Sequence, residues 1–99
     1  MEIVQGNGDK NEAIEYLGKE LAEHPKNGYA YYIMGLLYNE AGMAGDAIEP
    51  INKAIQYLQK DKDWITYAYR QRAKINLQLG NEQAAINDWN LAIKANPKD

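Results

Sequence analysis

The fold of this chain is decided by three similar segments, GDKNEAI at residues 8–14, GMAGDAI at residues 42–48 and GNEQAAI at residues 80–86. Their leading glycines lie 34 and then 38 residues apart. A period in this range is typical of stacked helical repeats, in which each unit buries its apolar side against a neighbour. The sequence therefore predicts an array of similar units.

Each segment joins a helix end to a close helix contact. Glycine suits the left-handed backbone that often follows a helix. The alanine five residues later is small enough for two antiparallel helices to approach each other; these alanines are Ala13, Ala47 and Ala85. The segments thus mark turns between paired helices.

Apolar residues between these turns recur at helical spacing. One stripe consists of Tyr31, Met34, Gly35 and Tyr38, the next of Ala47, Ile51, Ala54 and Tyr57 or Leu58, and the last of Ala85, Trp89, Ala92 and Ile93. Such spacing predicts amphipathic α-helices. Asn27 and Asp63 are suited to cap helices, and Pro25 and Pro97 follow helices that must stop. The expected fold class is all-α.

These residues resemble the tetratricopeptide repeat (TPR) family. Residues 28–61 match its motif at Tyr31, Met34, Gly35, Tyr38, Ala47, Ile51 and Ala54, and residues 66–99 match it at Tyr69, Ala73, Ala85, Trp89, Ala92 and Pro97. Residues 1–27 match only its second half, at Ala13, Leu17 and Pro25. The resemblance implies a short right-handed superhelical array of antiparallel helix pairs. About two and a half repeats form one domain over residues 1–99: a half repeat at 1–27 that acts as an N-terminal cap, and repeats at 28–61 and 62–99.

The chain departs from this pattern in three places. About four additional residues at 59–63 predict a longer second helix in the middle repeat. Pro50 removes a hydrogen bond there, so we expect a kink, a late start, or a proline in the first turn. Arg72 lies where the family buries an apolar residue; it either pairs with an acid of the preceding helix or indicates a loose seam.

The composition excludes several classes of chemistry. The chain has no Cys, no Ser and a single His, so we expect neither a metal site nor a cofactor nor an enzyme. Residues 1–27 hold six acidic and three basic side chains, whereas residues 62–99 hold four acidic and six basic ones. This balance argues against nucleic-acid binding, which needs a broad basic face. No signal or transmembrane segment is recognised, so the compartment is unassigned, with the cytoplasm as the default.

The resemblance implies that the first helices of the repeats line a concave surface that binds a peptide or a helix of another protein. By phase, the residues expected to bind that partner are Tyr29, Tyr32, Leu36, Asn39, Tyr67, Arg70, Gln71 and Lys74. The alternative is that Tyr29 and Tyr32 simply pack against the N-terminal helix. Arg70 and Lys74 project together and suit a carboxylate or a phosphate, unless they form a solvated basic face.

The end of the array suggests a second kind of function. Ile86 and Ile93 would face a next helix, and solenoid ends need a polar cover. The alternative function is therefore a structural element that assembles through this apolar edge, for example as a homodimer through the C-terminal helix.

Overall fold

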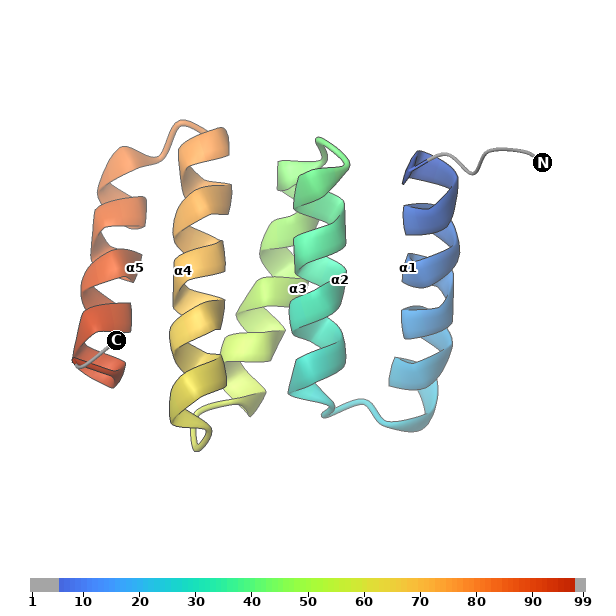
Figure 1. Cartoon of the computed structure of the whole chain (residues 1–99), viewed down its shortest axis with the longest axis horizontal. Coiled ribbons are helices and arrows are strands. Elements are labelled where there is room, and N and C mark those ends of the chain that lie inside the picture. Colours follow the sequence, from blue (N-terminus) through green and yellow to red (C-terminus); the bar gives the residue numbers. More distant parts are fainter. Residues whose placement is uncertain (1–5, 98–99) are drawn as a thin grey trace.

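The computed structural model describes residues 6–97, and these residues form five α-helices (Figure 1). The helices are α1 (Gly6–Glu23), α2 (Gly28–Glu40), α3 (Ala44–Tyr57), α4 (Lys62–Gln78) and α5 (Glu82–Ala95). Within residues 6–97 there is no strand, so the predicted all-α class is confirmed. Residues 1–5 and 98–99, which belong to the predicted first and last units, lie outside the described part.

The helices form an elongated array of about 45 × 31 × 22 Å. Helix α3 lies behind α2 in Figure 1, and α4 and α5 follow on one side. The pairs α2–α3 and α4–α5 pack most closely, while α4 also contacts α3 and α2. Helix α1 lies at the opposite end and, among the described helices, contacts α2 alone. Adjacent pairs thus share one interior, as expected for a TPR-like array.

Capping side chains and glycines set the helix ends. The Asn27 side chain accepts hydrogen bonds from the backbone N–H groups of Tyr29 and Ala30, which confirms it as the N-cap of α2. The cap of α4 is Asp61, not Asp63 as the sequence predicted, because the Asp61 carboxylate accepts from the Trp64 N–H. Gly42 and Gly80 adopt φ values of 81° and 82°, a left-handed conformation that favours glycine.

The core lies between α3 and α4, with a contribution from α2. Its buried residues are Ala47, Ile51, Ala54, Ile55, Leu58, Ile65, Ala68 and Ile75. Gly35 allows the close approach of α2 to α3, because a Cβ atom there would lie 3.3 Å from the Ile51 Cβ atom and 3.4 Å from the Ala47 carbonyl oxygen. The small residues of the repeat pattern therefore set the distance between paired helices.

The additional residues lengthen α4 and not α3. Helix α3 has 14 residues and ends at Tyr57, whereas α4 has 17 and begins at Lys62. The prediction of a longer second helix was wrong because the chain turns at residues 58–60 and the Asp61 cap then starts α4 early. Pro50 lies well inside α3, which is continuous from Ala44 to Tyr57, so neither a late start nor a first-turn position is correct.

Arg72 has a well-defined partner. Its guanidinium donates to the Asp88 carboxylate of α5 at 2.8–3.1 Å and to the Asn52 amide oxygen of α3 at 2.9 Å. The Asn76 amide donates to the same carboxylate at 2.9 Å. The acid thus comes from the following helix and not the preceding one, and the seam is closed by hydrogen bonds.

Across the described helices, none combines the length and the apolar character that crossing a membrane requires.

Candidate functional site

Four aromatic side chains gather where α2 and α4 lie beside each other. Trp64 of α4 makes edge-to-face contacts with Tyr29 and Tyr32 of α2, both at a centroid distance of 5.3 Å, and with Tyr67 of α4 at 5.5 Å. Such contacts stabilise the rings beyond the area that they bury. We call Tyr29, Tyr32, Trp64 and Tyr67 the aromatic cluster.

Trp64 owes its place to the early start of α4. It lies in the first turn of that helix, three residues before Tyr67, so the two side chains share a face. Trp64 is absent from the site residues predicted from the sequence. Its i, i+3 spacing to Tyr67 was the available signal, but the prediction placed the additional turn in the wrong helix.

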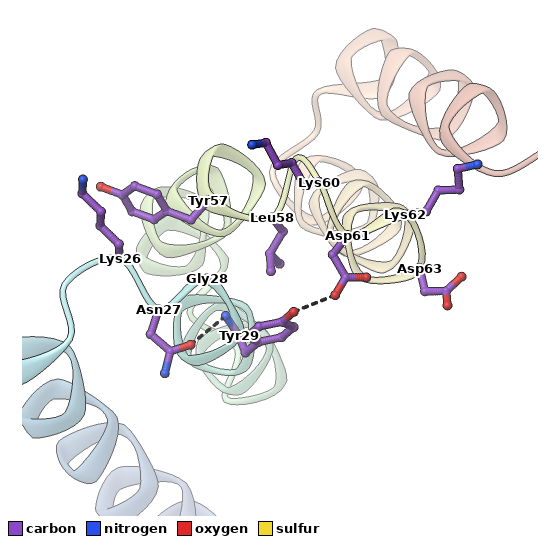
Figure 2. A pocket seen from close by; sticks show the side chains of 10 residues that line it. All are labelled: Lys26, Asn27, Gly28, Tyr29, Tyr57, Leu58, Lys60, Asp61, Lys62 and Asp63. Carbon is purple, nitrogen blue, oxygen red and sulfur yellow. Dashed lines mark hydrogen bonds between the residues drawn. The ribbon is translucent and has the colours of Figure 1, made fainter.

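A hydrogen bond links Tyr29 of the aromatic cluster to Asp61, the N-cap of α4 (Figure 2). The Tyr29 hydroxyl donates to the Asp61 carboxylate at 2.6 Å. This bond, helped by the backbone N–H groups of Trp64 and Asp63, lowers the pKa of the Asp61 carboxyl below its ordinary value. The same bond raises the pKa of the Tyr29 phenol, with burial and the Asp61 charge acting in the same direction. Burial, followed by the neighbouring Tyr67, raises the pKa of the Tyr32 phenol.

Beside this bond lies an open cavity of about 490 Å³, bounded by the α1–α2 connection and the α3–α4 turn. Its charged lining is mixed: Lys60, Asp61, Lys62 and Asp63 come from the α3–α4 turn and the start of α4, and Lys26 lies on the other side, in the α1–α2 connection (Figure 2). Neither sign dominates, so the cavity does not by itself indicate a charged ligand.

The predicted partner-binding residues of α2 lie at different depths. Tyr29 is 44% exposed, whereas Tyr32, Leu36 and Asn39 are half-buried. Tyr29 and Tyr32 pack against Trp64 of α4. The packing alternative named the N-terminal helix, whereas these ring contacts are made with α4. Asn39 holds its Oδ1 atom buried without a hydrogen-bond partner among the described residues.

The predicted partner-binding residues of α4 also differ in how exposed they are. Tyr67 is 41% exposed, Lys74 is exposed, and Arg70 is half-buried. Gln71 is only 5% exposed, which leaves no room for the atoms of a partner. We therefore remove Gln71 from the set of candidate binding residues.

The exposed apolar residues of α5 are the second candidate surface. Ile86 and Ile93, the predicted edge, are 49% and 63% exposed, and Trp89 between them is 37% exposed. Large apolar side chains exposed together often mark an interaction surface.

The chain is similar in sequence to several known proteins. No family model matches. Serine/threonine-protein phosphatase 5 of Rattus norvegicus and that of Homo sapiens are each 31% identical to the chain over 91 residues, which are 92% of this chain and 17% of the phosphatase. A TPR repeat-containing protein of Methanocaldococcus jannaschii is 29% identical over 91 residues, which are 91% of this chain and 28% of that protein.

The chain thus spans less than a third of the length of these curated relatives. The aligned region nevertheless covers nearly all of this chain, and one of the relatives is a TPR repeat protein by name. Together with the five packed helices, these findings confirm the resemblance to the TPR family.

Proposed function

We propose that this chain, a TPR-like protein-interaction module, binds an extended peptide or a helix of another protein across the face formed by α2 and α4. We call this surface the α2–α4 face. It consists of the exposed and half-buried residues Tyr29, Tyr32, Ile33, Leu36, Asn39, Tyr67, Arg70 and Lys74.

The aromatic cluster is the observation that carries this proposal. Tyr29 and Tyr67 are both exposed residues, although each packs in a T-shaped contact against Trp64. Tyrosines fixed in this way lose little conformational entropy on binding, and aromatic residues are enriched among the side chains that dominate binding energies. Ile33 and Leu36 extend the apolar surface along α2. The surface suits an apolar side chain of a partner.

Polar groups follow along the two helices. Lys74 is exposed two turns after Tyr67 and suits an acidic side chain of the same partner, with Arg70 one turn away from each. The Asn39 amide oxygen lacks a hydrogen-bond partner among the described residues, so rotation of that amide would let it accept from a peptide N–H. We therefore expect a preference for peptides that combine an aromatic or aliphatic residue with an acidic one.

No catalytic activity is proposed for this chain. The phosphatase relatives align with it over 17% of their length, so their printed activity is not transferred to these residues.

A displayed peptide library selected on the immobilised chain tests the proposal. We expect the selected peptides to bind Tyr67→Ala at least about tenfold more weakly, because that ring is a central exposed contact. Lys74→Glu should weaken the binding of acidic peptides and leave the binding of neutral peptides unchanged. Isothermal titration gives the affinities, and thermal melting verifies that each variant folds.

The matched control is Ile86→Ala, which removes an apolar side chain of similar exposure from α5. It should leave peptide affinity unchanged. Peptides that lose affinity with Ile86→Ala and keep it with Tyr67→Ala would place binding on α5 and overturn the proposal.

A further inference from the structure

An open groove of about 370 Å³ lies between α3 and α5. Both helices pack against α4, but within the described residues their backbones do not approach each other. The sides of the groove include Ile48 and Asn52 of α3 and Leu91 of α5. Between them lie Arg72 and Asn76 of α4, which form its floor. We call this feature the α3–α5 groove.

The α3–α5 groove is distinct from the α2–α4 face. Arg72 follows Arg70 of that face by two positions, and Asn76 follows Lys74 by two positions. Two positions correspond to about 200° around an α-helix. The two surfaces therefore use different sides of α4, and the inference below goes beyond the proposed function.

The polar groups of the floor have hydrogen-bonding capacity that the fold does not use. A guanidinium has five N–H groups. Those of Arg72 donate to the Asp88 carboxylate and to the Asn52 amide oxygen. One N–H on each terminal nitrogen of Arg72 is thus left without an acceptor among the described residues.

The Asn76 amide oxygen is a second open group. Its amide nitrogen donates to Asp88, but no described residue donates to its Oδ1 atom. Asn76 is only 8% exposed, whereas among the described side chains Asn39 alone holds a fully buried polar atom without a partner. The Asn76 oxygen therefore keeps access to solvent at the groove. An unpaired acceptor at this depth favours a ligand that can donate to it.

We propose that the α3–α5 groove binds the carboxamide of a glutamine side chain from a partner protein. Arg72 offers N–H donors, and Asn76, one turn later on α4, offers an acceptor. One edge of a primary carboxamide carries both a C=O and an N–H, whereas a trans backbone peptide group directs these two in opposite directions. The glutamine C=O accepts from Arg72, and its N–H donates to the Asn76 oxygen.

The charges of the floor favour a neutral ligand. Asp88 is buried and already balances the Arg72 guanidinium at 2.8 Å. An entering carboxylate would be repelled by Asp88 and has no proton for the Asn76 oxygen. An ammonium group has no acceptor for the Arg72 N–H groups. A neutral group that is both donor and acceptor fits the floor.

The open shape of the groove favours a peptide over a small molecule. Small-molecule sites enclose most of the surface of their ligand, whereas this groove is open between two helices. Ile48 is half-buried and Leu91 is 37% exposed, so both can contact the residues on either side of the glutamine. Glutamine suits the floor better than asparagine, because its side chain is one methylene longer.

Displayed libraries of nine-residue peptides with a fixed central residue, selected on the immobilised chain, test the proposal. We expect the library centred on glutamine to be enriched at least about tenfold over matched libraries centred on glutamate and on methionine. Glutamate lacks the donor, and methionine lacks both the donor and a strong acceptor. On binding, the NMR signals of the Arg72 Nε–H and the Asn76 side-chain amide should shift.

Three variants locate the binding by isothermal titration of the selected glutamine peptides. Leu91→Ala should weaken their binding about fivefold or more, because it removes an apolar side of the groove. Leu79→Ala is the matched control, since Leu79 is 41% exposed and does not line the groove, and it should leave the affinity unchanged. Asn76→Leu should bring glutamine and methionine peptides to equal affinity. Thermal melting verifies that each variant folds.

Each remaining outcome overturns the proposal. Equal enrichment of the glutamine and glutamate libraries would exclude carboxamide recognition. Glutamine peptides that lose affinity with Tyr67→Ala and keep it with Leu91→Ala bind the α2–α4 face instead. If acetamide shifts the NMR signals of Arg72 and Asn76 while no peptide is enriched, the groove is a site for small amides and not for a partner protein.

Discussion

The α2–α3 and α4–α5 pairs share the small residues of the repeat but differ in the chemistry between their helices. Both pairs keep small residues at the close contact, with Gly35 and Ala47 in one and Ala73 and Ala85 in the other. At the three larger positions around that contact, the first pair has Met34, Tyr38 and Pro50, whereas the second has Arg72, Asn76 and Asp88. The first seam is largely apolar and the second is a hydrogen-bonded network.

This difference shows that the small and the larger side chains between paired helices have separate roles. The small residues set how closely the helices approach, so they recur in both pairs. The larger side chains only have to fill the space between the two helices and provide hydrogen-bond partners for any polar group among them. Asp88, with 5% of its side chain exposed, is tolerated because Arg72 and Asn76 both donate to it. We therefore expect the larger positions to be exchangeable as a set and not one at a time.

Removing one member of the polar set should have the largest effect on stability. Asp88→Ala leaves the Arg72 guanidinium and the Asn76 amide without their shared acceptor. We expect the free energy of unfolding to fall by about 3 kcal/mol, as measured by chemical denaturation.

A variant with the whole set changed sharpens this test. Arg72→Met, Asn76→Tyr and Asp88→Ala together give the second seam the apolar character of the first. We expect this variant to recover most of the loss, because exchanging a buried ion pair for apolar side chains is often close to neutral. A triple variant as unstable as Asp88→Ala alone would show that the seams are not exchangeable.

The first residue of α2 gives the next comparison. Gly28 corresponds to Thr66 of α4, which lies inside its helix because α4 starts one turn earlier. A Cβ atom at Gly28 would lie 2.7 Å from the Leu58 Cγ atom, and Leu58 is buried. We expect Gly28→Ala to lower the free energy of unfolding by about 2 kcal/mol, measured by chemical denaturation.

Gly18→Ala is the control for that substitution. Gly18 is an exposed position within α1, and a Cβ atom there would meet nothing within 4 Å. Alanine should therefore stabilise α1 by about 0.5–1 kcal/mol through helix propensity alone. If Gly28→Ala stabilised the protein as Gly18→Ala does, the close contact between Gly28 and Leu58 would not limit the size of the residue at position 28.

The sequence was sufficient to predict the repeat and its small residues. Glycine and alanine recurring at a fixed period are typical of turns and close helix contacts, and the asparagine at residue 27 caps α2 as predicted. The sequence alone did not show which of the two helices, α3 or α4, the additional residues would lengthen. Asp61 and Asp63 are both residue types suited to cap a helix, and the structure distinguishes them by the hydrogen bond from the Trp64 N–H to the Asp61 carboxylate.

The polar seam was difficult to predict for a related reason. Arg72 and Asp88 lie 16 residues apart, and several other acids were available to pair with the guanidinium. The fold chooses among them by bringing α4 and α5 together. Burial of Gln71 likewise depends on tertiary packing, because the matched residue of α2, Ile33, is exposed at the same phase. Periodicity predicts on which side of a helix a residue lies, but not how deeply that residue is buried in the array.

The smallest expected effect distinguishes the matched tyrosines Tyr29 and Tyr67. Only Tyr29 has its hydroxyl on Asp61. Because this bond lowers the pKa of the folded Asp61 carboxyl below its ordinary 3.8, its stabilising contribution is present above that pH. The contribution is lost as the pH falls through the lowered pKa. Carboxyl NMR titration should show the pKa of Asp61 rising toward 3.8 in Tyr29→Phe and unchanged in Tyr67→Phe. Equal shifts in both variants would mean that the aromatic cluster as a whole, and not this one hydroxyl, controls the carboxylate that caps α4.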